Sequence, residues 1–302
     1  MSNVSYHIPV LLKQSVDALV QNPDGVYVDA TFGGGGHAAE ILQRLSPKGR
    51  LFAFDQDVDA KGNVDEADTR LTFILSNFRY IQNHLAYHEV FEVDGILADF
   101  GVSSHEFDEH SRGFSFRFDA ELDMRMNQSQ KLTAKTLVNE YSEEALAHVF
   151  GAYGELSNAR KIASAICVAR RAKDIDTIKE LLEVIKGYTS DKTRNKFYAR
   201  VFQALRMEVN DEVGALNDFL INSVGLLKKD ARLVCITYHS LEDRPVKNIM
   251  KTGNLDGNVE RDFFGVAKIP FSEVSRKVIV PEKEEVSENS RSRSAKLRIA
   301  IK

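Results

Sequence analysis

A run of four glycines follows a short apolar segment near the start of the chain, in the stretch DATFGGGGH (residues 29–37). The segment that leads into it, VYVDAT (26–31), is typical of a β-strand, and apolar residues at 38, 39, 41 and 42 follow at helical spacing. A flexible linker would also be rich in glycine, but linkers carry serine and other polar residues rather than apolar neighbours. We therefore predict that the glycines form a turn inside a packed strand–turn–helix unit.

The segments around this turn continue the same pattern. Strand-like segments occur at 26–31, 50–57, 71–76 and 93–102, and helical patterns lie between them near 36–46, 58–66 and 78–88. Such alternation is typical of βαβ units around a parallel sheet. Near-continuous apolar segments such as GILADF (95–100) indicate a sheet that is covered on both faces.

The α/β pattern stops after residue 102 and resumes about a hundred residues later. A polar stretch is followed by helical segments, including a basic-faced helix near 158–173 and a capping box at Thr177 and Glu180. A helix from about Asp211 and strands at 232–240, 275–281 and 294–302 follow, the last two as antiparallel neighbours. We therefore predict a discontinuous sheet domain, residues 1–105 plus 212–302, with an inserted loop and helical domain at 106–211.

The charge of the chain is unevenly distributed. The net charge is −4, but residues 156–206 hold 12 Lys or Arg and 5 Asp or Glu, a local charge of +7, so the remainder carries −11. The end of the chain, 287–302, is also basic, with five cationic residues and one acidic residue. The negative net charge argues against a protein coated with basic residues. The two basic segments indicate a local surface for an anionic partner.

Composition limits the classes of protein that this chain can belong to. With 302 residues and 43% hydrophobic content it can bury a core. No apolar run approaches the roughly 18 residues of a membrane span, and the start lacks the features of a signal peptide, so we expect a cytoplasmic protein. Cys167 and Cys235 have no Cys or His at metal spacing, so we expect buried thiols and no metal site.

A glycine-rich turn after the first strand of such a sheet is suited to a nucleotide-like ligand. Residues 33–38 satisfy the relaxed dinucleotide pattern G-x-G-x-x-A, so a nicotinamide cofactor remains an alternative. S-adenosylmethionine is favoured, because Asp29 precedes the glycines and Asp55 ends the second strand, where a carboxylate can bind ribose hydroxyls. The structural alternative for Asp55 is a solvated acid. His37 is interpreted as a helix cap or a cofactor contact.

Sequence blocks along almost the whole chain carry a family resemblance. They are HIPVLL, DATFGGGGH, VDGILADFGVSS, RGFSFRFDAELDMRM, FQALRMEVNDE, YHSLEDR and ENSRSRSAKLRIA. In this order they resemble the RsmH (MraW) family of ribosomal RNA methyltransferases. The resemblance implies a Rossmann-like class I methyltransferase sheet with an inserted helical domain. It also implies S-adenosylmethionine-dependent methylation of the exocyclic N4 of a cytosine in the decoding centre of 16S rRNA, within the small ribosomal subunit.

The resemblance also implies roles for individual residues. The methionine part of the cofactor would lie against Gly34, Gly35, Gly36 and His37, the ribose at Asp55, the adenine beside Phe78, and Asp99 at the edge of the active site. Glu106 stands where the family usually has glutamine, and His105 where it has proline. A carboxylate cannot donate the hydrogen bonds of an amide, so a cofactor contact by Glu106 is the least supported of these roles.

Methyl transfer to an exocyclic amine depends mainly on positioning and on an acceptor for an amino hydrogen. Asp99, at the end of the fourth strand, is the first candidate for that acceptor, and a role limited to cofactor binding is its alternative. His239, in YHSLEDR, is a second candidate for proton transfer or base contact. Its structural alternative is to brace the start of the next helix, which Ser240 and Asp243 indicate. Pro245 is tolerated if that helix begins near Asp243, because the proline then lies in the first turn.

Recognition of an unstacked base in RNA requires aromatic and cationic side chains. From the resemblance, Arg112, Phe114 and Arg125 would line the substrate pocket, although a plain hairpin with alternating phenylalanines would have the same spacing. Arg194 and Arg200 are candidates for phosphate contacts, with an ordinary solvated face as the alternative. The family's His-Pro pair is absent there, replaced by Lys196 and Phe197.

Two further functions remain as alternatives at this stage. One is an NAD-dependent oxidoreductase, which depends on the relaxed glycine pattern alone. The other is a non-catalytic ribosome-assembly factor that binds RNA, which the presence of both Asp55 and Asp99 argues against. A homodimer is compatible with the sequence, but nothing in the sequence requires one.

Overall fold

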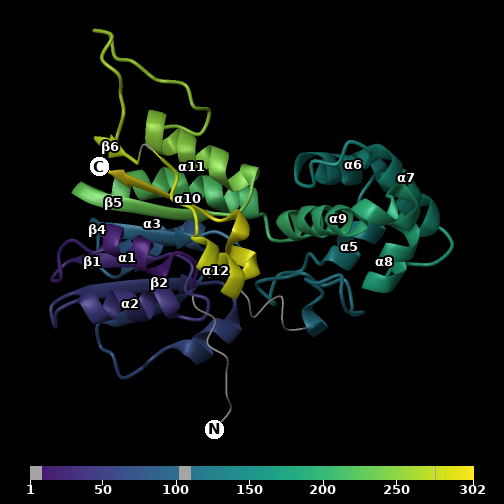
Figure 1. The fold of residues 1–302 in the computed structure, drawn as a ribbon, viewed down its shortest axis with the longest axis horizontal. Helices are drawn as coiled ribbons and strands as arrows, with labels where there is room; N and C mark the ends of the chain where they lie inside the picture. The colour runs from purple at the N-terminus through teal and green to yellow at the C-terminus, as the bar shows by residue number, and fades with distance from the viewer. Residues whose placement is uncertain (1–8, 102–109, 276) are drawn as a thin grey trace. The chain divides into compact units, whose positions relative to one another are not determined.

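A mostly parallel sheet is the framework of one part of the chain in this computed structural model, which describes residues 9–101, 110–275 and 277–302 (Figure 1). The seven strands of the described residues lie in the order β3-β2-β1-β4-β5-β7-β6. In chain order they are β1 (Val26–Asp29), β2 (Arg50–Asp55), β3 (Leu71–Leu75), β4 (Val93–Asp99), β5 (Leu227–Thr237), β6 (Glu273–Val274) and β7 (Lys296–Ile301). Neighbours from β3 to β5 are parallel, whereas β7 pairs antiparallel with β5 and β6. The predicted fold class, a mostly parallel sheet with an antiparallel edge, is confirmed.

Helices cover both faces of this sheet. They are α1 (Leu12–Leu19), α2 (Gly36–Arg44), α3 (Ile81–Tyr87), α10 (Glu212–Leu226), α11 (Ser240–Thr252) and α12 (Lys283–Glu288), with short 3-10 helices η1 (Val58–Asn63), η2 (Phe78–Tyr80) and η6 (Ser290–Ser294). Alternate residues of β4 belong to opposite cores: Ile96 packs with α3, α10 and α11, and Leu97 packs with α1 and α2. Because both faces are buried, the strands are almost continuously apolar, as predicted.

A glycine in the middle of β4 allows one helix to lie close to the sheet. A Cβ atom on Gly95 would lie 2.8 Å from Cδ1 of Leu19 in α1 and 3.1 Å from the ring of Tyr27 in β1. Any side chain at this position would therefore push α1 away from the strands. The close packing of α1 on β4 depends on this glycine.

Two predictions about local structure were wrong. The helix expected at 58–66 is the short 3-10 helix η1, in which Ala60 is the buried residue, so a longer helix would have no apolar face to pack. The strand expected at 275–281 is instead the two-residue β6, followed by a single bridge from Ile279 to Leu297. The helix start indicated by Ser240 and Asp243 is confirmed, because α11 begins at Ser240. Pro245 therefore lies in the second turn of α11, where it provides no N–H to the preceding turn.

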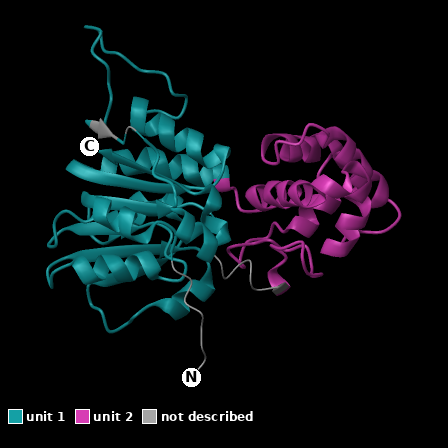
Figure 2. Cartoon of the chain, viewed as in Figure 1, with its two compact units in different colours: residues 1–101, 213–302 teal, residues 102–212 magenta. Residues whose placement is uncertain are grey.

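The chain divides into two compact units (Figure 2). The sheet unit comprises residues 1–101 and 213–302, and the helical unit comprises 102–212. The helical unit contains η3 (His110–Arg112), α5 (Ala134–Glu140), α6 (Glu143–Ala152), α7 (Ala159–Ala169), α8 (Ile178–Ile185), η4 (Lys186–Tyr188), η5 (Asp191–Thr193) and α9 (Arg194–Val209).

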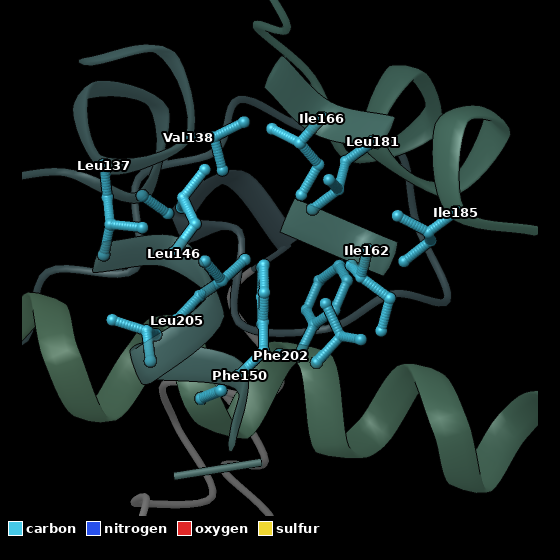
Figure 3. Packing of buried hydrophobic residues seen from close by; sticks show 14 of the residues in the cluster. Leu137, Val138, Leu146, Phe150, Ile162, Ile166, Leu181, Ile185, Phe202 and Leu205 are labelled. Atoms are coloured by element: carbon cyan, nitrogen blue, oxygen red, sulfur yellow. The ribbon is translucent and has the colours of Figure 1, made fainter. Parts of the chain in front are cut away.

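The helical unit has its own hydrophobic core (Figure 3). Leu146 and Phe150 of α6, Ile162 of α7 and Phe202 of α9 are among its buried side chains. The capping box predicted at the start of α8 is present, because Thr177 accepts a hydrogen bond from the Glu180 N–H and the Glu180 carboxylate accepts one from the Thr177 N–H. The unit is therefore packed independently of the sheet.

Cys167 and Cys235 are both buried and form no disulfide, which confirms that they fill the cores. Among the described residues, no helix has the length and apolarity that crossing a membrane requires.

Candidate active site

Three aspartates end three adjacent strands of the sheet. Asp29 ends β1, Asp55 ends β2 and Asp99 ends β4, and the strands lie in the order β2-β1-β4. Since the strands are parallel, their carboxyl ends meet at one edge of the sheet, which is where ligands of such folds bind. The charge of Asp29 is close enough to raise the pKa of Asp99, and that of Asp55 raises the pKa of Asp29. The edge is therefore acidic.

Asp29 is the most deeply buried of the three. Its relative exposure is 0%, its Oδ1 accepts a hydrogen bond of 3.1 Å from the Thr31 N–H, and its Oδ2 is buried without a hydrogen-bond partner among the described residues. Burial, and secondarily the charge of Asp55, raises the pKa of Asp29 to about 7, while the bond from Thr31 opposes this shift. A buried carboxylate oxygen without a donor indicates a position for a ligand that donates hydrogen bonds or carries positive charge.

Asp55 links its strand to the glycine turn. Its Oδ2 accepts a hydrogen bond of 2.7 Å from the Gly33 N–H, and its Oδ1 accepts one of 2.8 Å from the Asp57 N–H. Burial raises the pKa of Asp55 to about 6, although these two hydrogen bonds oppose the shift. Each carboxylate oxygen can accept a further bond, so Asp55 keeps the capacity to bind a ligand hydroxyl.

The four glycines of the turn are required for different reasons. Gly33 and Gly35 have positive φ angles of 50° and 76°, in the left-handed region that favours glycine. A Cβ on Gly36, the first residue of α2, would lie 2.2 Å from Cγ of Pro9. A Cβ on Gly34 would meet no atom within 4 Å. Backbone conformation explains Gly33 and Gly35, packing explains Gly36, and Gly34 leaves backbone open to a ligand.

His37 lies in the first turn of α2, behind the glycine turn. Its side chain is 5% exposed, and its Nε2 has no hydrogen-bond partner among the described residues. Burial lowers the pKa of His37 to about 4, against the opposing effect of the Val10 carbonyl, so the imidazole is neutral at pH 7. A cofactor contact by His37 would therefore involve a neutral ring or the backbone.

Asp99 is held by two neighbours that sequence analysis did not identify. The Tyr238 hydroxyl donates a hydrogen bond of 2.9 Å to Oδ1 of Asp99, and the Asp99 N–H donates one of 2.7 Å to the Thr31 hydroxyl. Burial raises the pKa of Asp99 to about 8, Tyr238 opposes the shift, and the charges of Asp29 and Glu242 add to it. Tyr238 follows β5 directly, but nothing local in the sequence indicates that β5 lies beside β4.

His239 is the N-cap residue of α11. Its Nε2 lies 2.8 Å from Oε1 of Glu242, and Oε2 of Glu242 accepts a hydrogen bond of 2.7 Å from the Tyr238 N–H. Glu242 thus fixes both residues that follow β5. It does so through their backbone N–H groups, and it positions Tyr238 at the same time. Despite the short distance to Glu242, both ring nitrogens of His239 are buried without a hydrogen-bond partner among the described residues, so a brace at the helix start and a contact with the substrate both stay predictions.

Phe78 lies in η2, directly after the third strand. Its ring contacts those of Phe100 and Phe219 edge-to-face, at centroid distances of 5.8 and 5.3 Å. Phe78 is only half-buried, whereas Phe100 and Phe219 belong to the core. The pair therefore holds Phe78 at the carboxyl side of the sheet with part of its ring still accessible.

Several predicted substrate residues support the helical unit itself. The Arg112 guanidinium donates to the carbonyls of Arg125 and Met126, and the Arg125 guanidinium bonds to Asp123 and to the carbonyls of Gln128 and Gln130. Phe114 is 4% exposed and belongs to the core of the helical unit, and its contact with a base stays a prediction. Asn210 completes this network through hydrogen bonds of 2.8 Å to the Met126 N–H and the Met124 carbonyl.

The other predicted residues are placed as follows. Arg194 begins α9, is exposed and pairs with Asp191, and Arg200 lies two turns further along the same helix, half-buried. Phe197 and Phe202 anchor that helix in the core. Glu106 lies outside the described residues.

The chain is similar to one family of known proteins over almost its whole length. Residues 4–302 match the family model of the MraW methylase family. The chain is 58% identical over 298 residues to ribosomal RNA small subunit methyltransferase H of Bacteroides fragilis strain YCH46, covering 99% of this chain and 98% of that protein. It is 54% identical over 301 residues to the protein of the same name from Flavobacterium johnsoniae, covering 100% and 99%.

Solved structures also share similarity with the chain. A putative rRNA methylase from Clostridium thermocellum has a TM-score of 0.42 at 13% identity and 98% coverage of both chains. A putative methyltransferase from Streptococcus mutans, solved in complex with SAH, has a TM-score of 0.39 at 12% identity, covering 96% of this chain and 94% of that one. These TM-scores are low, so the fold assignment depends on the strand order described above.

Proposed function

Since the chain belongs to the MraW methylase family, we propose that it methylates the exocyclic N4 of a cytosine in the decoding centre of 16S rRNA. The protein is a methyltransferase of small-subunit ribosomal RNA, and S-adenosylmethionine is its cofactor. The choice of base and atom is the proposal. A site of action on the ribosome also places the proposed activity in the cytoplasm.

The observation that carries the proposal is the carboxyl group of Asp99 on the acidic edge, because methylation of an amino nitrogen needs an acceptor for its hydrogen. The rest of this edge, beside the glycine turn, fits the cofactor. S-adenosylmethionine supplies a methyl group on a positively charged sulfonium, and it also bears an ammonium group and ribose hydroxyls. The orphan oxygen of Asp29, the acceptor capacity of Asp55 and the open backbone at Gly34 fit a ligand with those donors and that charge. A dinucleotide would bring an anionic pyrophosphate to the glycine turn beside these carboxyl groups, and a carboxyl group that is ionised there would repel it. The geometry therefore favours a cationic cofactor over NAD.

The residues of the edge have distinct proposed roles. Asp55 accepts hydrogen bonds from the ribose, the turn from Gly34 to His37 lies against the methionine part, and the accessible part of Phe78 lies beside the adenine. The carboxylates of Asp55 and Asp99 accept three hydrogen bonds from other residues of the sheet unit. These hydrogen bonds hold both carboxylates in place before the ligand binds. Such preorganisation is the main contribution that a protein makes to transfer from an already activated donor.

Asp99 is the proposed acceptor for an amino hydrogen of the cytosine. The lone pair of that amino group is delocalised into the ring, and a carboxylate that accepts its N–H helps to localise it. Asp99 must be ionised to do so, and a positively charged ligand beside it favours the ionised form. The Tyr238 hydroxyl donates its hydrogen bond to Oδ1 of Asp99, so Oδ2 is the oxygen that would accept the cytosine N–H. His239 remains a second candidate for removing the proton.

We propose that the helical unit recognises the RNA and that the sheet unit performs the chemistry. Residues 156–206 of the helical unit carry the local charge of +7. Within it, α9 exposes Arg194 while burying Phe197, Val201 and Phe202, so the helix presents cations from a fixed position. Cations on a rigid helix suit contacts with phosphates.

The central test is transfer of a labelled methyl group from S-adenosylmethionine to small ribosomal subunits. Mass mapping of the rRNA should find one additional methyl group on the N4 of a decoding-centre cytosine. Label on another base or another atom would refute the N4 assignment while leaving the methyltransferase class intact. Binding of small subunits without any transfer would instead support a non-catalytic assembly factor.

A second test addresses the cofactor site alone. Calorimetry should show that Asp55→Ala loses at least about tenfold in affinity for S-adenosylmethionine, because a buried hydrogen-bonded carboxylate is removed. Asp65→Asn, at an exposed aspartate of the same unit, is the matched control and should bind normally. Full affinity in Asp55→Ala would contradict the role assigned to Asp55.

A further inference from the structure

A long loop joins α11 to β6 (Figure 1). It contains two adjacent phenylalanines, Phe263 and Phe264, within a turn that Asp262 and Val266 close. Phe263 is 97% exposed and Phe264 is 85% exposed, and Val259, Val266 and Ile269 beside them are also exposed. We call residues 253–270 the arm. Isolated exposed apolar residues are common on proteins, but a contiguous group of this kind marks an interaction site.

The tip of the arm is a built turn. Asp262 accepts hydrogen bonds of 2.9 Å from the N–H groups of Phe264 and Val266, and Gly265 has a φ of 80° that favours glycine. A bridge joins Arg261 to Ala267, and the Arg261 guanidinium donates to the Gly265 carbonyl at 2.7 Å. The two phenylalanine rings contact each other edge-to-face at 5.5 Å. The turn therefore presents both rings in a fixed arrangement.

The base of the arm is anchored to the sheet unit. Phe271, directly after the arm, is buried in the core, and the Asn248 amide of α11 donates to the Leu255 carbonyl at 2.7 Å. Next to this anchor lies a groove of about 410 Å³, with Ile221, Val224 and Ile249 among its lining residues. Residues 253–256 of the arm also line this groove, so the base of the arm and the groove are continuous.

The charge of the arm distinguishes between the possible partners. It contains three acidic and two basic residues, a net charge of −1, and Asp256 and Glu260 are exposed. Aromatic residues that stack on nucleic-acid bases work together with cations that contact the phosphates, and this arm has an excess of acids instead. Proteins of the small ribosomal subunit are generally basic, because they neutralise RNA, so an acidic arm complements them.

We propose that the arm is a docking element for a basic protein of the small ribosomal subunit. An apolar pocket of that protein receives Phe263 and Phe264. Basic residues at the rim of that pocket would face Asp256 and Glu260. This inference rests on the proposed function, because the partner belongs to the same substrate particle. It assigns recognition of protein to the sheet unit, separately from the recognition of RNA by the helical unit.

The first experiment measures equilibrium binding of the full chain to small subunits and to naked 16S rRNA. The variant Phe263→Ser/Phe264→Ser should bind small subunits about tenfold or more weakly, since buried aromatic anchors dominate interfaces, and should bind naked rRNA unchanged. Tyr87→Ser/Phe91→Ser is the matched control, because both side chains are exposed aromatics of the same unit, and it should bind both normally. Calorimetric affinity for S-adenosylmethionine should be unchanged in all variants, which shows that they fold.

The second experiment reverses charge. Asp256→Lys/Glu260→Lys should weaken binding to small subunits if the partner is a basic protein, and would strengthen it if the arm lay along phosphates. Equal losses on subunits and naked rRNA in the phenylalanine variant would overturn the proposal in favour of base stacking. The molar mass of the phenylalanine variant is also measured in solution without ribosomal subunits. A lower molar mass than that of the wild type would overturn the proposal, because the arm would then bind a second copy of this chain.

The two proposals fail in different ways. If the wild-type protein binds and methylates small subunits and the phenylalanine variant does so equally well, only the arm proposal is wrong. If the wild-type protein does not bind small subunits, the proposed substrate and the arm proposal are both wrong.

Discussion

Replacing Asp29 with asparagine should make the unliganded protein more stable at alkaline pH. Asp29 is fully buried, one of its oxygens has no donor within the part of the chain that the structure describes, and its pKa is raised from 3.8 to about 7. The folded state therefore holds the proton more tightly than the unfolded state, so stability is lost as pH rises towards 7. Asn at this position keeps an oxygen for the Thr31 N–H and cannot ionise, so the variant avoids that loss.

The magnitude follows from the shift in the pKa of Asp29. A shift from 3.8 to about 7 corresponds to about 4 kcal/mol over the full titration, at about 1.4 kcal/mol per pH unit. About two of those pH units lie above pH 5. The free energy of unfolding of Asp29→Asn relative to wild type should therefore rise by about 3 kcal/mol between pH 5 and pH 8.

Urea titration of both proteins without cofactor, at pH 5 and pH 8, measures this difference directly. Asp65→Asn, at an exposed position, is the control for the general effect of losing one carboxylate. The same Asp29 variant should bind S-adenosylmethionine more weakly, because the buried charge that destabilises the empty protein attracts the cationic ligand. A relative gain below about 1 kcal/mol would refute the assignment of a destabilising buried charge to Asp29.

Three further predictions follow from the geometry. Gly36→Ala should lower the free energy of unfolding by about 1–3 kcal/mol because its Cβ would clash with a proline ring, whereas Gly34→Ala should leave stability unchanged and weaken S-adenosylmethionine binding; urea titration and calorimetry separate the two. Tyr238→Phe removes a hydrogen bond that lowers the pKa of its aspartate partner, so kcat should fall and the rising limb of the pH–rate profile should move to higher pH. Replacing Arg194 and Arg200 with Gln should reduce the salt slope of RNA binding by about 2.

Each of these three has an outcome that would contradict it. Equal stability of the two alanine variants would show that the packing around the glycine turn is not as described. An unchanged pH–rate profile in Tyr238→Phe, with kcat reduced, would leave Tyr238 only a structural role. Lys48→Gln/Lys61→Gln, at two exposed cations of the sheet unit, is the control for RNA binding, and an equal change in its salt slope would argue against the helical unit as the RNA-binding surface.

The sequence alone was sufficient for the sheet architecture, the turn of glycines and the capping box of α8. These features depend on interactions between residues that are near in sequence: strand and helix periodicity, positive φ angles at glycine, and a side chain that caps its own helix. For the same reason Asp55 and Asp99 were identifiable as residues at strand ends. Their roles as cofactor and substrate contacts came from the family resemblance and remain proposals.

The neighbours of those residues were decided only by the tertiary structure. Tyr238 meets Asp99 because β5 lies beside β4, although 139 residues separate them in the chain. Asp29 and Phe114 are buried because segments that are distant in the sequence pack over them. Sequence periodicity shows that a residue lies on a strand or on a helix face, but it does not show which distant segment will cover it. Burial and strand order, which set the pKa values and hydrogen bonds of this site, arise only when the whole chain packs.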